Sequence, residues 1–273
     1  MVELLAWGTL GAIVGSFLNV LILRRGKRPL TGRSACGGCG KVLAWYDLIP
    51  VFSWITLRGR CRSCNSTISV QYPLVETGTA LLFAAIAGAS LGTMWTAFAC
   101  VVAALLIAIF VYDLYHTLIP DAWAWTFNAL TFLSLFLFSL HPTPYTPYPV
   151  LAGPAIALPL FALWAVSRGT WMGFGDVKLA LGIGWLLGPL GGIQALFLAF
   201  IVGALVSVPL LFFSSSWWKR MQERFSPTGA SEKRRWGFTM KSEVPFGPFL
   251  ITATFIVWFL QMYGVEIPLI TFL

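Results

Sequence analysis

Charged residues are scarce in this chain of 273 residues, and acidic residues are the scarcest. Asp and Glu together number 10, and charged residues make up 10% of the chain, whereas hydrophobic residues make up 58%. Ordinary soluble domains carry about 25% charged residues, so the composition excludes a typical soluble domain. Apolar stretches of about 17 to 25 residues, the length that crosses the hydrocarbon core of a bilayer, recur along the chain. We therefore predict a polytopic membrane protein.

Eight segments have the length and apolar composition of membrane-spanning helices. They are residues 2–23, 74–91, 94–113, 122–140, 150–167, 177–189, 191–213 and 246–263. The sixth is short and ends at Gly188-Pro189, where glycine and proline favour a break between helices. We predict an all-α fold of about eight transmembrane helices, with a small cytoplasmic insert between the first two.

Basic residues are concentrated in two of the segments that connect these spans. Nine of the 18 Lys and Arg lie within residues 24–62, and seven lie within residues 219–241, whereas loops 87–93, 141–149 and 188–192 contain none. Because loops rich in Lys and Arg stay in the cytoplasm, this distribution places the N-terminus outside. Topology and anionic lipid explain the net charge of +8, and we expect no nucleic-acid partner.

The first predicted span (1–23) lacks the marks of a cleaved signal peptide. It has no basic n-region and no A-x-A site, and its basic cluster follows the apolar run. We expect it to stay as an anchor. Gly8, Gly11 and Gly15 form a stripe of small residues, a pattern that lets helices approach closely in lipid. Asn19 is expected to hydrogen-bond across that contact, which is favoured over a catalytic role.

Four of the five cysteines form two C-x-x-C pairs in the polar segment 24–72. The pairs are Cys36 with Cys39 and Cys61 with Cys64, separated by residues 40–60. Two such pairs on glycine-rich turns are typical of a tetrahedral four-cysteine zinc site. Disulfides are the alternative, which the reducing cytoplasm disfavours. We predict a zinc-binding domain in which the metal is structural, because four thiolates leave no coordination position open for catalysis.

Asp113 and Asp176 lie at the edges of predicted spans, on the same cytoplasmic side. Asp113 ends the third span, and Asp176 precedes the sixth within the sequence GFGD. Two neighbouring carboxylates can share a proton, hold a water molecule and hydrolyse an amide as general acid and base. Gly173 and Gly175 would leave room for an extended peptide beside Asp176. Helix capping by Asp176 and ion transport by the pair stay open as alternatives.

Three polar residues near these aspartates are assigned other roles. Asp121 follows Pro120 and is expected to cap the fourth span. His116 is expected to be an interfacial anchor. Lys178 points to a different helix face from Asp176 and is expected to extend toward the membrane surface.

Eight ordered motifs resemble the type IV prepilin peptidase family, and they extend over nearly the whole chain. They are GSFLNVLILR (15–24), RSACGGC (33–39), DLIPVFSW (47–54), LRGRCRSC (57–64), ISVQYPLVE (68–76), YDLYHTLIPD (112–121), GFGDVKL (173–179) and VPFGPFL (244–250). The resemblance implies an intramembrane aspartic endopeptidase of the GxGD type, within a multi-span domain at residues 73–273. By motif position, it implies Asp113 and Asp176 as the catalytic residues, with Asp121 in support.

The resemblance also implies substrates, cofactors and a location. Family members cut type IV prepilins or pseudopilins after a glycine, on the cytoplasmic side of the bacterial inner membrane. They then methylate the new N-terminus with S-adenosylmethionine as methyl donor. No residue here is assigned to the methyl donor, because no glycine-rich nucleotide loop follows a strand.

A transporter is the competing class of function, with the aspartates relaying protons or cations. A transporter predicts repeated halves and acidic residues near the bilayer centre, whereas this sequence has no convincing repeat and its acids cluster at one face. A scaffold that binds partners through the zinc domain is a third class, and it leaves the two aspartates unexplained.

Overall fold

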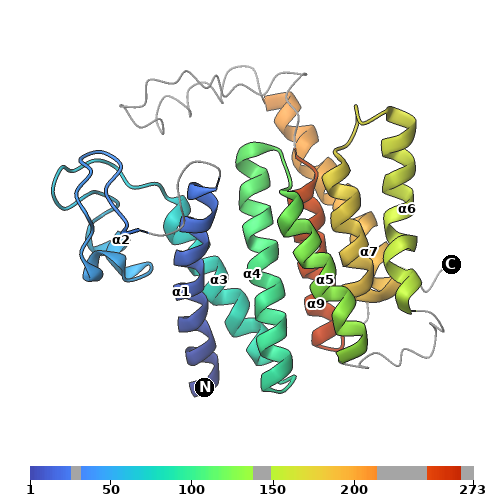
Figure 1. Ribbon diagram of the computed structural model, residues 1–273, viewed down its shortest axis with the longest axis horizontal. Coiled ribbons are helices and arrows are strands. Elements are labelled where there is room, and N and C mark those ends of the chain that lie inside the picture. Colours follow the sequence, from blue (N-terminus) through green and yellow to red (C-terminus); the bar gives the residue numbers. More distant parts are fainter. Residues whose placement is uncertain (26–31, 138–148, 214–244, 266–273) are drawn as a thin grey trace. The chain divides into compact units, whose positions relative to one another are not determined.

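The part of the chain that the computed structural model describes, residues 1–25, 32–137, 149–213 and 245–265, is helical and has no β-strand (Figure 1). The predicted fold class is confirmed. The long helices are α1 (Val2–Arg24), α3 (Gln71–Gly88), α4 (Thr93–His116), α5 (Asp121–Leu137), α6 (Pro149–Ser167), α7 (Phe174–Phe213) and α9 (Gly247–Met262). The cysteine segment contains a 3-10 helix, η1 (Trp45–Leu48), and one short helix, α2 (Phe52–Thr56). The basic loop 219–241 lies outside the described residues.

The helices overlap each of the predicted spans. Four helices in the described ranges are long and apolar enough to cross a membrane: Val2–Arg24, Thr93–His116, Pro149–Ser167 and Phe174–Pro209. Helix α9 is apolar but shorter. The chain is therefore a membrane protein, and the number of crossings, about eight, stays a prediction.

Helix α7 contains both the sixth and the seventh predicted spans, which meet at Gly188. This glycine has φ +74° and ψ 177°, a conformation that interrupts the helix and favours glycine. A Cβ built at Gly192 would lie 3.5 Å from the Cα of Gly184, although eight residues of straight helix would separate them by about 12 Å. The chain therefore reverses direction at Gly188, and the two halves of α7 pack together.

The chain divides into two compact units. One consists of Met1–Val111 with Met262–Gly264, and the other of Tyr112–Gln261 with Val265–Leu273. Each unit contains one of the two candidate sites, because the cysteine pairs lie in the first unit and Asp113 and Asp176 lie in the second.

In the first unit, α1 packs closely along α3 through its glycine stripe. A Cβ at Gly11 would lie only 2.7 Å from the carbonyl oxygen of Thr79, so a larger residue does not fit there. Across the same contact, Nδ2 of Asn19 donates a hydrogen bond to the carbonyl oxygen of Tyr72 at 3.2 Å. The predicted small-residue contact and the hydrogen bond of Asn19 are both confirmed.

In the second unit, the first half of α7 is held by α6. A Cβ at Gly184 would lie 2.5 Å from the carbonyl oxygen of Ala152, so the two backbones are in close contact. Nearby, Nε1 of Trp185 donates to the carbonyl oxygen of Val150 at 2.9 Å. This packing fixes the half-helix whose first turn carries Asp176.

Candidate active site and cysteine cluster

Each C-x-x-C pair lies on a tight turn closed by two backbone hydrogen bonds. In the first turn, the N–H of Cys36 donates to the carbonyl oxygen of Lys41 at 2.9 Å. The N–H of Gly40 donates to the carbonyl oxygen of Cys36, also at 2.9 Å. In the second turn, the N–H of Cys61 donates to the carbonyl oxygen of Ser66 at 2.8 Å, and the N–H of Asn65 donates to the carbonyl oxygen of Cys61 at 3.0 Å. Gly40 and Asn65 hold equivalent positions with φ of +70° and +56°, a conformation that glycine and asparagine tolerate best.

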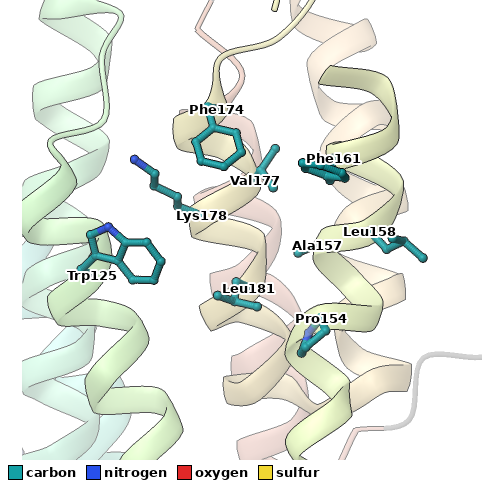
Figure 2. A pocket seen from close by; sticks show the side chains of 9 residues that line it. All are labelled: Trp125, Pro154, Ala157, Leu158, Phe161, Phe174, Val177, Lys178 and Leu181. Carbon is teal, nitrogen blue, oxygen red and sulfur yellow. The ribbon is translucent and has the colours of Figure 1, made fainter. Parts of the chain in front are cut away.

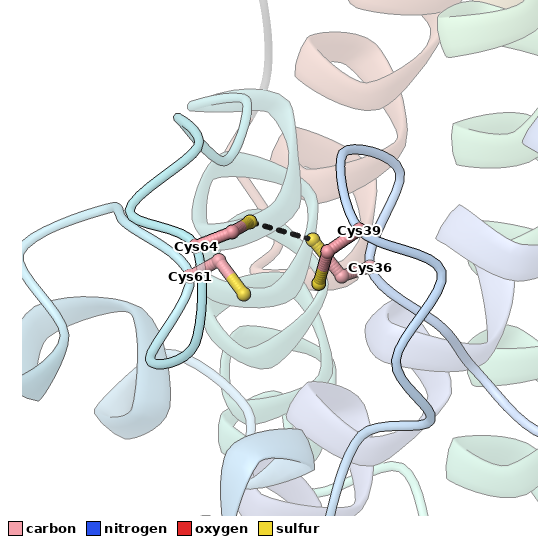
Figure 3. A group of neighbouring side chains, drawn as sticks. All are labelled: Cys36, Cys39, Cys61 and Cys64. Carbon is pink, nitrogen blue, oxygen red and sulfur yellow. Dashed lines mark hydrogen bonds between the residues drawn. The ribbon is translucent and has the colours of Figure 1, made fainter.

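The two turns bring the four cysteine sulfur atoms together (Figure 3). All four Sγ atoms lie within 4.8 Å of one another, and those of Cys36 and Cys64 are 3.7 Å apart. Zinc–sulfur bonds of about 2.3 Å in a tetrahedron separate the sulfurs by about 3.8 Å, so the cluster fits a zinc ion. The distance of 3.7 Å between the sulfurs of Cys36 and Cys64 is well beyond the length of a disulfide bond, about 2.05 Å, and suits two ligands of one metal ion.

Ser66 lies beside two of these sulfur atoms. Its Oγ is 3.4 Å from Sγ of Cys36 and 3.1 Å from Sγ of Cys64. The Ser66 hydrogen bond, helped by backbone N–H groups, lowers the pKa of Cys36 to about 6. It also lowers the pKa of the Cys64 thiol. Because the thiolate is the form that binds metal, Ser66 favours the metal-binding form of Cys36 and Cys64.

Asp113 and Asp176 lie close together and are both buried in the second unit. Asp113 is in the last turn of α4 and is 4% exposed, and Asp176 is in the first turn of α7 and is 7% exposed. The two carboxylates are near enough to interact electrostatically. The fold therefore brings together two acids that are 63 residues apart in the sequence (176 minus 113).

Local turns place the two aspartates at their helix ends. The N–H of Thr117 donates to the carbonyl oxygen of Asp113 at 2.8 Å, and Thr117 has φ +50°, so α4 ends just beyond the aspartate. Gly169, with φ +79°, turns the chain between α6 and α7. The N–H of Asp176 then donates to the carbonyl oxygen of Gly173 at 3.2 Å, so the GFGD sequence turns directly into α7.

Gly247, the first residue of α9, packs its backbone against the Asp113 carboxylate. A Cβ at this position would collide with Oδ2 of Asp113 and would lie 3.3 Å from its Cγ. The same Cβ would lie 3.2 Å from Cδ1 of Ile119, which is buried. Sequence reasoning did not assign a role to either residue. The sequence feature that could have indicated Gly247 is the motif VPFGPFL (244–250), in which this glycine lies between two prolines.

The two glycines before Asp176 differ in their surroundings. A Cβ at Gly173 would have Oδ2 of Asp176 as its nearest neighbour, at 3.8 Å, which leaves ordinary space. A Cβ at Gly175 would lie 2.9 Å from Cβ of Ile119. Room for a peptide beside Gly173 stays a prediction, whereas the space at Gly175 is filled by Ile119, so the expectation of room there is wrong.

Lys178 and His116 have partners of their own near the aspartates. Nζ of Lys178 donates to Oδ1 of Asp121 at 2.6 Å and lies 5.1 Å from the centre of the Phe174 ring. Lys178 therefore forms an ion pair with the first residue of α5, a contact that sequence reasoning missed. The His116 ring stacks on that of Tyr112, with centroids 4.2 Å apart, and its role as an interfacial anchor stays a prediction.

An apolar pocket of about 230 Å³ lies between α5, α6 and α7 (Figure 2). Its lining includes Trp125 of α5, Phe161 of α6, and Val177 and Lys178 of α7. Lys178 is the only charged residue among those that line it. Val177 directly follows Asp176 in the sequence, but neither Asp113 nor Asp176 lines the pocket.

Together these features define a class of protein: a helical membrane protein with two buried, interacting aspartates at helix ends and a cluster of four cysteines. Residues 9–89 match the family model described as Bacterial Peptidase A24 N-terminal domain. Residues 100–208 match the model described as Type IV leader peptidase family. The chain belongs to the type IV leader peptidase family, and the membership expected from its motifs is confirmed.

Relatives agree with this assignment. A protein of Xanthomonas campestris named Prepilin leader peptidase/N-methyltransferase is 31% identical over 92% of this chain and 88% of its own length. A protein of Pseudomonas putida with the same name is 31% identical over 94% of this chain and 90% of its own length. A third, from Myxococcus xanthus, is 38% identical over 64% of this chain, and the match spans 47% of that protein. No solved structure matches the chain significantly.

Proposed function

We propose that this chain is a membrane-embedded aspartic endopeptidase that removes the basic leader of type IV prepilins or pseudopilins. The observation that carries the proposal is the pair of buried, interacting aspartates, Asp113 and Asp176. The substrate class follows from relatives that are named prepilin leader peptidases. We place cleavage after a glycine, as the resemblance to the family implies. We place it on the cytoplasmic side of the bacterial inner membrane, because the distribution of basic residues predicts that both aspartates lie on that side.

In the proposed mechanism, one aspartate is ionised and the other is protonated, because like charges at close range resist double ionisation. The ionised carboxylate takes a proton from a water molecule while the water oxygen attacks the scissile carbonyl carbon. The other carboxyl group donates its proton to the carbonyl oxygen. When the tetrahedral intermediate collapses, the C–N bond breaks and the departing amine takes the proton that the first carboxyl group gained from water. One hydroxyl of the intermediate returns its proton to the second carboxylate, which restores the starting state. The two aspartates titrate as a unit.

Substrate binding follows from the surroundings of Asp176. Gly173 is exposed, and a Cβ there would be only in ordinary contact with Asp176, so an extended peptide could approach the aspartate at this position. The apolar pocket beyond Val177 is suited to an apolar side chain of the substrate's membrane segment. We propose that the cleavage site lies across the aspartate pair, with the apolar part of the substrate directed toward this pocket.

We propose that the same chain also methylates the new N-terminus, because its relatives carry both activities in their names. S-adenosylmethionine would supply the methyl group, and we assign no described residue to its binding. The four cysteines would hold a structural zinc ion that keeps residues 24–72 folded, since a segment of this size has little apolar core of its own. Residues 73–273 would then form the peptidase domain.

Cleavage of a prepilin in membranes tests the proposal. Wild type should release a short N-terminal peptide, and Asp113→Asn and Asp176→Asn should each lower the rate by a factor of at least about 10². Glu3→Gln, which removes an exposed acid at the start of α1, is the matched control and should cleave normally. Near-normal cleavage by either aspartate variant would remove that residue from the pair. A folded wild type that cleaves no prepilin would refute the function.

A further inference from the structure

The cysteine segment exposes a group of large apolar side chains on η1, α2 and the turn between them. Trp45 is 77% exposed, Phe52 is 71% exposed and Ile55 is 60% exposed. Tyr46, Leu48 and Ile49 are also exposed, each by at least 40%. Large apolar side chains that are exposed together on one short segment indicate an interaction site, because water solvates them poorly.

The same segment is hydrogen-bonded to a buried carboxylate of α3. The N–H of Val51 donates to Oε2 of Glu76 at 2.7 Å, and Glu76 is only 6% exposed. Val51 has φ +63°, which is rare for a β-branched residue, so this bond holds a strained backbone in place. A carboxylate within an apolar helix is costly and commonly has a function. Here the carboxylate joins two partners, Ser16 of α1 and the segment that carries the exposed apolar side chains.

The position of this contact along the membrane-spanning helix α1 indicates its depth in the membrane. A Cβ at Gly15 would lie 2.8 Å from the Cα of Glu76, so Glu76 lies at the level of Gly15. Nine residues separate Gly15 from Arg24 (24 minus 15), or about 13 Å along the helix axis. Because α1 is long and apolar enough to span a membrane, the segment around Val51 is held beside the membrane-spanning part of α1, below its charged end.

The backbone of this segment is suited to an apolar environment. The N–H groups of Phe52, Ser53, Ile55 and Leu57 donate to backbone carbonyl oxygens within residues 49–57, at 2.6 to 3.1 Å. Unpaired backbone groups are strongly disfavoured in hydrocarbon, where no water can satisfy them. The segment therefore pairs much of its polar backbone internally while it exposes apolar side chains.

We propose that residues 45–56 form a membrane-inserted anchor whose apolar side chains lie in the boundary between lipid headgroups and acyl chains. Aromatic residues favour this boundary, and exposed basic residues favour the anionic phosphates above it. Arg58 and Arg60, both exposed, follow the segment directly. The hydrogen bond from Val51 to Glu76 sets the depth of insertion and thereby fixes the cysteine domain to the bilayer. This inference does not depend on the proposed peptidase activity.

Photocrosslinking of the full chain tests this anchor. The photoreactive residue p-benzoylphenylalanine replaces Phe52 in one protein and Lys41, an exposed residue of the first cysteine turn, in the control. Both proteins are placed in vesicles of phosphatidylethanolamine and phosphatidylglycerol, irradiated, and examined by mass spectrometry. The anchor predicts a phospholipid adduct at position 52 that exceeds that at position 41 on the order of tenfold, because only the anchor is buried in lipid. Equal adducts at the two positions, or none at position 52, would overturn the proposal, as would crosslinking of position 52 to a second protein.

Two substitutions of Glu76 test its part in setting the depth. Glu76→Gln retains a side-chain oxygen that can accept from Val51 and should keep the lipid adduct at position 52. Glu76→Leu removes the acceptor and should lose most of that adduct, in a protein that elutes from gel filtration as wild type does. An undiminished adduct in folded Glu76→Leu would overturn the depth-setting role. The comparison of positions 52 and 41 tests the anchor itself even where a Glu76 variant does not fold.

Discussion

Replacing Gly247 with alanine tests whether the start of α9 shapes the aspartate pair. The added Cβ would collide with Oδ2 of Asp113, and it would lie 3.2 Å from Cδ1 of Ile119 on its other side. Ile119 is buried and in turn packs against Gly175, so it has little room to retreat. The Asp113 carboxylate is therefore the group that moves. A displacement on the order of 1 Å in a catalytic group can cost about 10²-fold in rate.

We accordingly expect Gly247→Ala to lower kcat for prepilin cleavage on the order of 100-fold, with a much smaller change in KM. The fold should survive, because Gly247 does not have a positive φ and alanine is favoured over glycine in helices by about 1 kcal/mol. Time courses of leader release by the solubilised enzyme, at several prepilin concentrations, give kcat and KM separately.

The matched control is Gly203→Ala, the same substitution on the face of α7 that meets α9. Its Cβ would lie 3.3 Å from Cδ2 of Phe249, and a ring edge can shift by the few tenths of an ångström required. This variant should retain kcat within a small factor of wild type. A normal kcat for Gly247→Ala would refute the reasoning, and equal losses in the two variants would show that α9 is sensitive to any added methyl group.

Three further substitutions test the packing, the metal and the turn in α7. Gly11→Ala should lower the free energy of unfolding by about 1 to 3 kcal/mol, because its Cβ would lie 2.7 Å from a backbone oxygen. The control is Gly8→Ala, whose Cβ would lie 3.7 Å from its nearest atoms. In detergent, this control should unfold at the wild-type temperature. Cys39→Ser should lose most of the bound zinc measured by elemental mass spectrometry, since a serine hydroxyl is a poor zinc ligand, and full retention would exclude Cys39 as a ligand. Gly188→Ala should lower the free energy of unfolding by about 1 to 2 kcal/mol, because a φ of +74° is strained for alanine. An unchanged unfolding temperature would argue against the chain reversal at this position.

The helices could be predicted from the sequence because their signals are local. Apolar runs of membrane-spanning length mark each helix, and the Gly188-Pro189 pair marks the reversal inside α7. The two cysteine turns could also be predicted from the sequence. Each turn is determined locally by the C-x-x-C spacing and by the glycine or asparagine that follows it in left-handed conformation. Ser66, which lies beside two of the sulfurs, could not be singled out from other polar residues near them.

The remainder of the candidate active site depends on contacts between segments far apart in the sequence. The glycine of VPFGPFL could be recognised as a family feature, but its packing on Asp113 follows from the arrangement of α4 and α9. Gly175 shows the opposite case, because a glycine beside a candidate catalytic residue suggested space for a peptide. The structure fills that space with Ile119. Whether a glycine leaves room for substrate or for a neighbouring side chain depends on tertiary packing.

The few acidic residues of the chain include three carboxylates that are buried despite the energetic cost. Among the residues described, the buried charged side chains are Glu76, Asp113 and Asp176, and each carboxylate costs about 2.5 to 3.5 kcal/mol to place in a membrane helix. Glu76 offsets its cost by accepting the N–H of Val51 at 2.7 Å, as expected of a residue that fixes structure. Asp113 instead faces a second carboxylate and the bare backbone of Gly247. Such surroundings increase the energetic cost of both carboxylates. The proposed mechanism, in which the two acids act together on a water molecule and a substrate, would account for them.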